Sequence, residues 1–250
     1  MKRLIYLLMS LSFVAFVSCS DDDKETNKTE NGHEYVDLGL TSGTKWATMN
    51  IGASKPQDYG NYYAWGETTT KETYNWSTYL DGNIANSDDC GTDKDALKGV
   101  TDIAGTQYDA AKANWGGKWR MPTKAQQDEL RNECCWVWTS SYNNSGVKGY
   151  IVYKAKSSSD KGAKIEDGET PTASYSLSDA HIFLPVAGWC RDGGPDGAGT
   201  YGSYWSSSLD PDNTDSAWDI YFYLGYVCDS YGTDGSYDRY FGMSVRAVFK

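Results

Sequence analysis

The segment Trp115-Gly116-Gly117-Lys118-Trp119-Arg120-Met121-Pro122-Thr123 decides how the middle of the chain folds. Its glycine pair is a normal C-terminal stop for the alanine-rich run before it, which predicts a short helix over Gln107–Asn114. Its last two residues open a second helix, because Thr123 and Gln126 have the spacing of a capping box. This second helix is expected to end near Cys134. Two short helices are therefore expected, one on each side of the tryptophan-containing segment.

Strand patterns dominate the rest of the chain. Tyr35–Leu40 and Lys45–Ile51 flank Thr41–Thr44, which is a hairpin pattern. Further strand candidates are Tyr150–Ala155, His181–Val186 and Met243–Phe249. Asp81–Gly105 and Ser157–Ser178 are polar, show little periodicity, and are expected to be surface loops. The pattern predicts an α+β fold with a twisted antiparallel sheet, two short helices and long ordered loops.

The clearest alternation lies in Trp218–Leu224. A strand places successive side chains on opposite faces, so this segment predicts one core side and one contact side. The core side is expected to hold Trp218, Ile220, Phe222 and Leu224. The contact side is expected to hold Asp219, Tyr221 and Tyr223. In the last strand candidate, Arg246 is expected to point away from Met243, Val245 and Ala247.

The first residues have the pattern of a secretory leader. Two basic residues precede the apolar run Leu4–Val17, which is too short to span a bilayer as a stable helix. The run ends in Phe16-Val17-Ser18-Cys19, which resembles a bacterial lipobox. Residues 1–18 are therefore expected to be a lipoprotein signal peptide, and Cys19 the lipidated residue.

The residues after Cys19 are acidic and polar. Ser20-Asp21-Asp22-Asp23-Lys24-Glu25 resembles the signal that exports lipoproteins of Bacteroides-like bacteria to the outer face of the outer membrane; the alternative is a solvated linker. Residues 19–32 are expected to be a disordered tether and residues 33–250 one domain. Loss of the leader removes two of 23 basic residues and none of 34 acidic ones, so the net charge changes from −11 to −13. Ordinary nucleic-acid binding is excluded by this charge.

The region Gly199–Tyr240 has the composition of a binding surface. It contains eight Tyr, seven Ser, seven Asp and two Trp, with no Lys or Glu. Tyrosine and tryptophan supply rigid contact area, and serine supplies adaptable hydrogen bonds, as in antibody paratopes. The alternative is an aromatic-rich sheet edge without a ligand.

Several segments, in order along the chain, resemble one protein family, the Fibrobacter succinogenes major paralogous domain. Besides the segment quoted first, they are Tyr35–Leu40, Ser42–Ala47, Asn61–Glu67, Ile182–Gly188, Tyr204–Ser208 and Ser244–Val248. The chain departs from the family pattern in the long Ser157–Ser178 insertion and in Ala247, where proline is more common. The resemblance implies a C-type-lectin-like fold of the version shared with formylglycine-generating enzymes.

The resemblance also implies a function. In this fold the C-terminal half forms the ligand face, so we expect a non-enzymatic surface protein that binds a glycan or a protein. Some relatives are diversified by retroelements that rewrite adenine-containing codons, and the residues of Trp205–Tyr240 are compatible with that. The expected contact residues are Trp205, Asp219, Tyr221, Tyr223, Tyr226, Asp229, Tyr231, Asp234, Tyr237 and Tyr240. The alternatives are a formylglycine-generating-type oxidase and a structural or fimbria-like subunit.

Catalytic and metal-binding patterns are weak. Lipidation of Cys19 leaves five cysteines, of which Cys190 and Cys228 are the candidates for an oxidase pair by position, outside any copy of that family's motif. The two histidines, His33 and His181, fit no zinc spacing, and no cofactor is expected. Asp210–Asp215 offers oxygen atoms to calcium but lacks the glycine and distal glutamate of an EF-hand loop, so an acidic turn is the alternative. The tryptophans expected in the core are Trp46, Trp65, Trp115 and Trp119.

Overall fold

The structure, a computed structural model, describes residues 28–228 and 236–250. The expected signal peptide, the lipidation residue Cys19 and most of the expected tether lie outside the described residues. Helix α1 (Ala110–Trp115) begins after Asp109, whose carboxylate accepts the main-chain N–H groups of Ala111 and Lys112 at 2.8 and 3.0 Å. The predicted first helix is therefore present, but it starts later than expected because Asp109 caps it.

Helix α2 (Lys124–Glu133) begins at the predicted capping box. The Thr123 hydroxyl accepts the N–H of Gln126 at 3.3 Å, and the Gln126 side-chain oxygen accepts the N–H of Thr123 at 3.1 Å. The Gln126 amide also donates to the Thr44 hydroxyl at 2.6 Å, which ties the helix start to the N-terminal hairpin. The chain then passes directly into strand β5 (Cys134–Thr139).

The N-terminal sheet has the strand order β1-β2-β3-β16 and contains the predicted hairpin. Strands β2 and β3 pair antiparallel, with Val36 opposite Trp46. Strand β1 lies in the segment expected to be a tether, and the Glu30 carbonyl accepts the indole N–H of Trp119 at 2.7 Å. The end of the expected tether is thus part of the sheet. The strands are β1 (Thr29–Glu30), β2 (His33–Asp37), β3 (Lys45–Ala47) and β16 (Val248–Phe249).

A second sheet has the order β7-β5-β6-β8 and contains two of the predicted strands. Strands β5, β6 and β8 form an antiparallel series, and β7 joins β5 in parallel. Because β7 lies within Ser157–Ser178, that segment is not wholly an irregular loop. Besides β5, the strands are β6 (Gly149–Lys154), β7 (Lys164–Ile165) and β8 (His181–Pro185).

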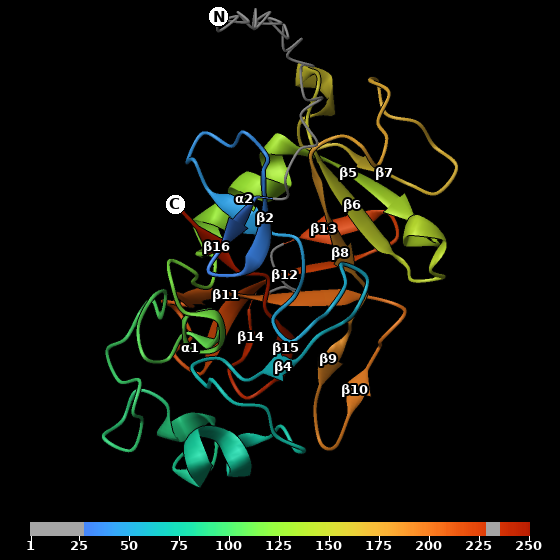
Figure 1. Ribbon diagram of the computed structural model, residues 1–250. Coiled ribbons are helices and arrows are strands. Elements are labelled where there is room, and N and C mark those ends of the chain that lie inside the picture. The colour runs from blue at the N-terminus through green and yellow to red at the C-terminus, as the bar shows by residue number, and fades with distance from the viewer. Residues whose placement is uncertain (1–27, 229–235) are drawn as a thin grey trace, which may run out of the picture.

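The third sheet crosses the middle of the molecule (Figure 1). Its order is β13-β12-β11-β15-β4, with β14 also paired to β12, and a separate hairpin is formed by β9 and β10. Its longest strands are β11 (Gly202–Leu209) and β12 (Ser216–Tyr223). The others are β4 (Tyr62–Tyr63), β9 (Trp189–Cys190), β10 (Pro195–Asp196), β13 (Tyr226–Cys228), β14 (Tyr237–Asp238) and β15 (Met243–Ser244).

The expected closing strand Met243–Phe249 is divided between two sheets. Strand β15 pairs with β11 and β4, whereas β16 pairs with β3. Between them, Arg246 is buried and donates to the side-chain oxygen of Asn50 at 2.8 Å and to the carbonyl of Phe183 at 2.7 Å. The expected strand is therefore interrupted around Arg246, whose buried side chain bonds to residues of other segments.

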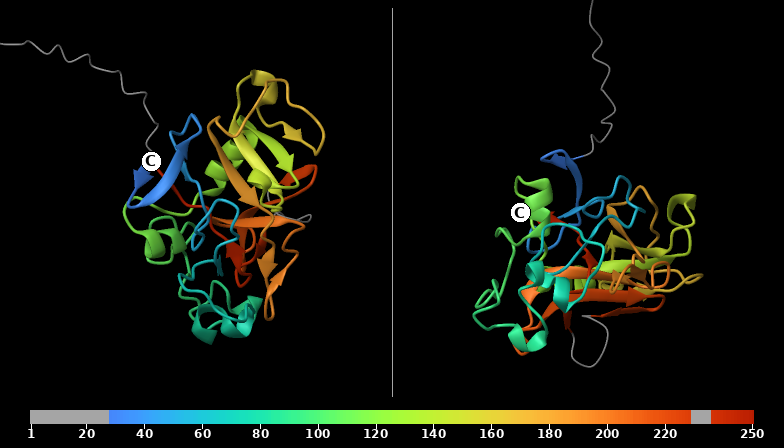
Figure 2. Two further views of the ribbon diagram at one scale, coloured as in Figure 1. Left: turned by 45° about the vertical axis from the view of Figure 1, so that its right-hand side comes forward. Right: turned by 90° about the horizontal axis from the view of Figure 1, so that it is seen from below.

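Two large buried clusters hold these sheets together. One joins all three sheets and α2, and includes Trp46, Trp136 and Phe222. The other surrounds α1 and contains Trp119 and Trp205. The four tryptophans expected in the core are buried, as predicted. A segment with short 3-10 helices (Trp76–Gly82 and Ser87–Asp89) lies at the opposite end of the molecule from the sheet β7-β5-β6-β8 (Figure 2). The observed fold class is α+β, as predicted.

Candidate ligand-binding face

One face of strand β12 carries a continuous series of aromatic rings. Its other face packs into the core through Ile220 and Phe222. On the aromatic face, the ring of Tyr221 lies 6.2 Å from that of Trp189 and 5.7 Å from that of Tyr201. Trp189 also contacts Tyr201 at 4.3 Å. Rings from β9, from the residue before β11 and from β12 therefore form one packed layer.

The series reaches the surface at the turn between β12 and β13. Tyr223 and Tyr226 are opposite one another across a two-residue turn, in which Gly225 has a φ of 78°, a left-handed conformation that favours glycine. Their rings stack at 5.1 Å with an interplanar angle of 27°. Tyr223, Leu224 and Tyr226 are 39, 45 and 44% exposed, which makes this turn the most exposed aromatic feature in the described part of the chain.

Three expected contact residues are buried, which corrects the predicted contact side. Trp205, Asp219 and Tyr221 are 0, 2 and 4% exposed. The Trp205 indole donates to the Tyr63 carbonyl at 2.9 Å, which is a core interaction. Asp219 lies opposite Trp205 in the β11–β12 register, and Tyr221 is covered by Trp189 and Tyr201. Both faces of β12 are therefore packed over most of its length, and only its end reaches solvent.

The expected core side of this strand also changes at its ends. Trp218 is half-buried, with the Lys124 ammonium 4.8 Å from its ring centroid, and Leu224 is exposed in the turn. Leu224 follows the last residue of β12, where alternation no longer predicts sidedness, and Trp218 lies at the register shift between β11 and β12.

Two more expected contact residues are half-buried members of the same aromatic series. Tyr237 lies 5.2 Å from Trp189 and 5.3 Å from Phe241, measured between ring centroids. Tyr240 stacks on Phe241 at 4.7 Å and contacts Trp76 at 4.9 Å. The expected contact residues Asp229, Tyr231 and Asp234 lie outside the described residues.

Sequence reasoning missed two residues of this face. Trp189 lies before the tyrosine-rich region, and Tyr201 lies within it without being singled out. Tyr201, Ser203 and Trp205 alternate in the same way as Asp219, Tyr221 and Tyr223, and this signal could have assigned Tyr201 to the face. No local pattern could have assigned Trp189, because it comes from a separate hairpin.

The five described cysteines form no disulfide with one another, and four of them are buried. Burial raises the pKa of Cys190 to about 11 and that of Cys134 to about 12. A thiol with such a pKa is protonated and poorly nucleophilic near neutral pH. Cys228 is half-buried in β13, opposite Tyr221. Cys190 and Cys228, the candidates by position for an oxidase pair, are not disulfide-bonded to each other.

The acidic segment Asp210–Asp215 forms a hydrogen-bonded turn. The Asp210 carboxylate accepts the N–H of Asp212 at 3.0 Å and the hydroxyl of Ser236 at 2.6 Å. Among the described residues, no group of three or more acidic, histidine or cysteine side chains is arranged to hold a metal ion. The turn interpretation accounts for these contacts.

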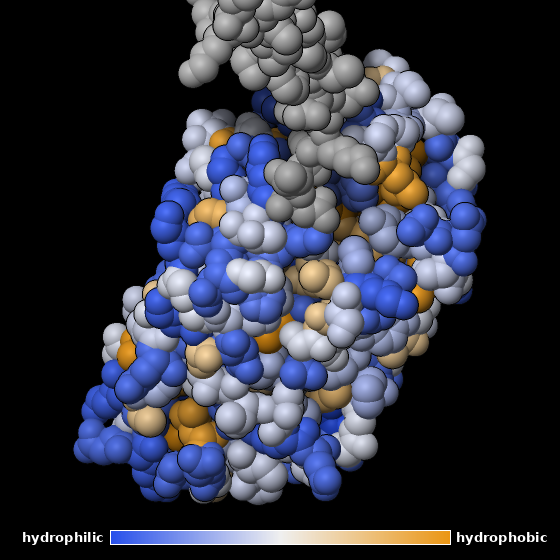
Figure 3. Space-filling model, in the orientation of Figure 1, coloured by the Kyte–Doolittle hydropathy of each residue, from blue (hydrophilic) through white to orange (hydrophobic). Residues whose placement is uncertain are grey.

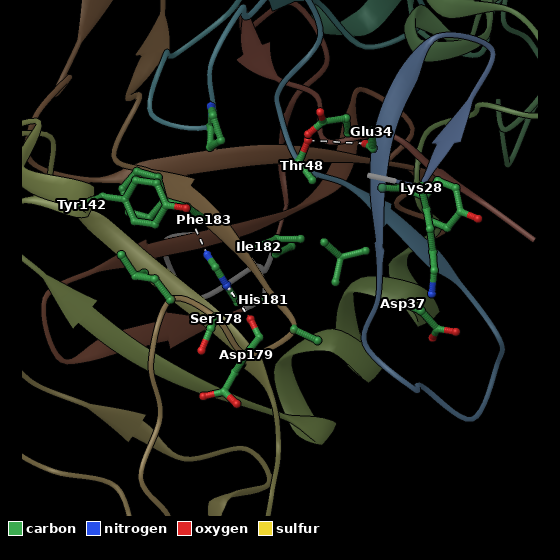
Figure 4. A pocket seen from close by; sticks show the side chains of 15 residues that line it. Lys28, Glu34, Asp37, Thr48, Tyr142, Ser178, Asp179, His181, Ile182 and Phe183 are labelled. Atoms are coloured by element: carbon green, nitrogen blue, oxygen red, sulfur yellow. Dashed lines mark hydrogen bonds between the residues drawn. The ribbon is translucent and has the colours of Figure 1, made fainter. Parts of the chain in front are cut away.

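A groove of about 520 Å³ lies on another part of the molecule, between β2 and the segment that ends in β8 (Figure 4). One wall contains the successive residues 34–37, and the other contains the successive residues 177–183. Pockets that bind ligands commonly measure about 300–1,000 Å³. The groove therefore has the size of a binding site, although sequence reasoning did not identify it.

A fixed histidine lies in one wall of this groove. His181 Nδ1 lies 2.7 Å from the Asp179 carbonyl oxygen, which can only accept, so Nδ1 carries the proton. The other ring nitrogen, Nε2, then accepts from the Tyr142 hydroxyl at 3.0 Å. Burial lowers the pKa of His181, although the contact with Asp179 opposes this shift. The arrangement keeps His181 neutral and fixed in orientation.

No protein-family model, curated protein or solved structure matches this chain. The family resemblance therefore remains a prediction that rests on the sequence segments quoted above. Within residues 28–228 and 236–250, no helix is long and apolar enough to cross a bilayer. On the side of the molecule drawn in Figure 3, the surface is mainly hydrophilic with small, separate hydrophobic patches.

Proposed function

We propose that this protein is a non-enzymatic recognition protein, anchored by lipid at Cys19 to the outer membrane and facing the outside of the cell. Its domain would be a C-type-lectin-like member of the Fibrobacter succinogenes major paralogous family. The observation that carries the proposal is the exposed, stacked pair Tyr223–Tyr226, which continues inward as a packed aromatic layer. The ligand would be a glycan or a protein.

The packed layer supports the proposal because it makes the exposed rings rigid. Tyr223 contacts Tyr221 at 5.9 Å, and Tyr221 is itself held by Trp189 and Tyr201. Rings that are fixed before binding lose little entropy when a ligand arrives. Tyrosine is enriched at binding hot spots, and its ring packs on sugars or side chains while its hydroxyl forms hydrogen bonds.

The chemistry of the thiols supports a binding protein over an oxidase. Thiolate chemistry requires an accessible cysteine with a lowered pKa. Cys190 is buried, its pKa is raised to about 11, and its main chain pairs with that of Gly242. Opening this site would require breaking the pairing that holds β9 in place.

A glycan and protein array tests the proposed function. Wild-type protein should bind a defined ligand, and Tyr223→Ala/Tyr226→Ala should lose most of that binding because both exposed rings are removed. Leu177→Ala is the matched control, because Leu177 is also exposed and apolar but lines the groove instead. Equal binding by wild type and the double variant would contradict the site. Large assemblies in size-exclusion chromatography, with no ligand on either array, would favour a structural subunit instead.

A further inference from the structure

A carboxylate lies directly against the exposed aromatic turn between β12 and β13. A β-carbon placed on Gly225 would lie only 2.4 Å from Glu166 Oε1, so the Glu166 carboxylate occupies the space beside this glycine. Glu166 directly follows β7, which ends at Ile165, and it is exposed. The turn that carries the stacked rings of Tyr223 and Tyr226 is therefore bordered by an exposed carboxylate from a different sheet.

The buried residue Tyr150 holds this turn in position. The N–H of Gly225 donates to the Tyr150 hydroxyl at 3.1 Å, and this hydroxyl donates to the Tyr223 carbonyl at 3.4 Å. Burial is the main cause that raises the pKa of Tyr150 to about 12, and the charge of Glu166 contributes, which agrees with a carboxylate close to the turn. Because Tyr150 belongs to β6, the turn is fixed relative to the sheet that carries Glu166.

The negative charge beside the turn is not compensated by a cation of the described chain. Among the described residues, no lysine or arginine forms an ion pair with Glu166, or with Asp167 and Glu169, which are exposed in the same segment. Lys164 of β7 is turned into the protein, where its ammonium group donates to two main-chain carbonyls, both at 2.8 Å. The Glu166 carboxylate therefore retains its attraction for a cation from outside.

Aromatic rings beside an uncompensated carboxylate match the chemistry of an arginine side chain. A guanidinium group is planar and stacks on an aromatic face, while its N–H groups pair with a carboxylate. One arginine can therefore use both features of the turn. The formal net charge of −11 also favours a cationic ligand over an anionic glycan and increases the rate at which it approaches. A neutral sugar would gain the stacking but not the ion pair.

We propose that the site at Tyr223 and Tyr226 binds a protein ligand through an exposed arginine, whose guanidinium stacks on one of the two rings and pairs with the Glu166 carboxylate. This inference rests on the proposed function of the aromatic face and selects a basic protein over a glycan as its ligand. Gly225 contributes by its lack of a side chain, because any larger residue at this position would displace the carboxylate from the turn.

Nuclear magnetic resonance on the ¹⁵N-labelled protein tests the inference, with a blocked glycine peptide that carries one arginine as the probe. The expected result at low ionic strength is saturable shifts of the Tyr223, Gly225 and Tyr226 amides. The same peptide with citrulline, which has the shape of arginine without its charge, should bind about three- to fivefold more weakly, because an exposed ion pair is lost. Glu166→Gln should weaken arginine binding by the same factor and leave citrulline binding unchanged, because both changes remove one interaction.

Asp93→Asn is the matched control, because it removes the same charge from a side chain that is 98% exposed in the loop 81–105, and it should leave peptide binding unchanged. Absence of binding, equal binding of the arginine and citrulline peptides, or tighter binding of methyl glucoside at the same amides would each overturn the inference. An array ligand that requires Tyr223 and Tyr226 but not Glu166 would also overturn it, while the proposed function would stand. If the double tyrosine variant bound every array ligand as wild type does, the proposed function would fail, and this inference with it.

Discussion

Arg239 and Asp95 form an ion pair with a nitrogen–oxygen distance of 2.8 Å, and each side chain is only 1% exposed. The guanidinium also lies over the rings of Trp65 and Tyr79, at 5.8 and 5.5 Å from their centroids. Arg239 follows strand β14, whose Tyr237 belongs to the aromatic face, and Asp95 lies in the long loop 81–105. The pair therefore connects the loop 81–105 to the segment that follows β14, next to Tyr237 of the candidate site.

Asp95→Asn is expected to destabilise the protein strongly. Removal of one partner leaves a buried charge without compensation, which costs about 3–5 kcal/mol in the free energy of unfolding. Asp95 also accepts the N–H groups of Gly91 and Leu97, and these contacts add to the loss. Urea denaturation measures the effect. Asp93→Asn is the control, because the Asp93 side chain is 98% exposed, and it should leave the unfolding midpoint unchanged.

Tyr221 and Tyr223 should respond to alanine substitution in opposite ways, although they are separated by one residue. Tyr221→Ala removes a buried ring and should cost about 3–5 kcal/mol of stability. Tyr223→Ala removes an exposed ring and should change stability by less than about 1 kcal/mol, while it weakens ligand binding. Thermal unfolding together with the binding arrays separates the two effects. Similar melting temperatures for the two variants would contradict the burial difference.

The parts of the fold that could be predicted depend on local signals. The capping box of Thr123 and Gln126 fixes the start of α2 by contacts between neighbouring residues, so this start does not depend on what the helix packs against. The hairpin of β2 and β3 follows from alternation on both sides of a turn. By contrast, burial of Tyr221 depends on Trp189, a residue of a different hairpin, and sheet packing of this kind overrides the alternation pattern.

The groove could not be predicted, because its walls come from strands far apart in the sequence. Residues of β2 give no sign that β8 will lie opposite them, and the free edge of β8 is defined only by the sheet order. The aromatic composition of this face was predicted, but the burial of its individual residues was not. Among the expected contact residues, Tyr223 and Tyr226 are exposed, whereas Trp205, Asp219 and Tyr221 are buried.

The free energy of unfolding should fall as the pH decreases below 6.5. Burial lowers the pKa of His181 from its ordinary value of 6.5, so the unfolded chain takes up a proton at a higher pH than the folded chain does. The contribution of neutral His181 is therefore fully present above pH 6.5 and is lost as the pH falls through the folded-state pKa. Glutamine does not titrate, so His181→Gln should reduce the slope of the free energy of unfolding against pH. Urea denaturation at pH 7 and at several pH values below 6.5 measures this slope.

His33 provides a matched comparison for the pH effect. Its ring stacks on Trp115 at 3.9 Å, and burial also lowers its pKa. His33→Gln should remove a separate part of the slope, and the double variant should remove both parts, because the two histidines occupy different sites. An unchanged slope in His181→Gln would show that the Tyr142–His181 contact does not depend on a neutral imidazole.

Alkylation should show that three of the buried cysteines are protected in the folded domain. In the native domain at pH 8, iodoacetamide should leave Cys134, Cys135 and Cys190 unmodified, because burial raises their pKa to about 12, 11 and 11. All three should react after denaturation. Mass spectrometry of digested samples measures both states. Rapid native alkylation of Cys190 would revive the oxidase interpretation, since that chemistry requires a reactive thiol.

Arg246→Lys should be destabilising even though it conserves the charge. The guanidinium donates to four oxygens, of which the Thr48 and Phe183 carbonyls belong to residues that line the groove. Lysine has three donors on one nitrogen and cannot reproduce this planar arrangement, so two or more buried carbonyls lose a partner at about 1–3 kcal/mol each. Arg131→Lys, at a more exposed ion pair, is the control and should have little effect.

Because the Phe183 carbonyl would be released into the groove, exchange of the His181 and Phe183 amides should also become faster in Arg246→Lys. A stability loss without this local change would mean that Arg246 supports the core but not the edge of β8.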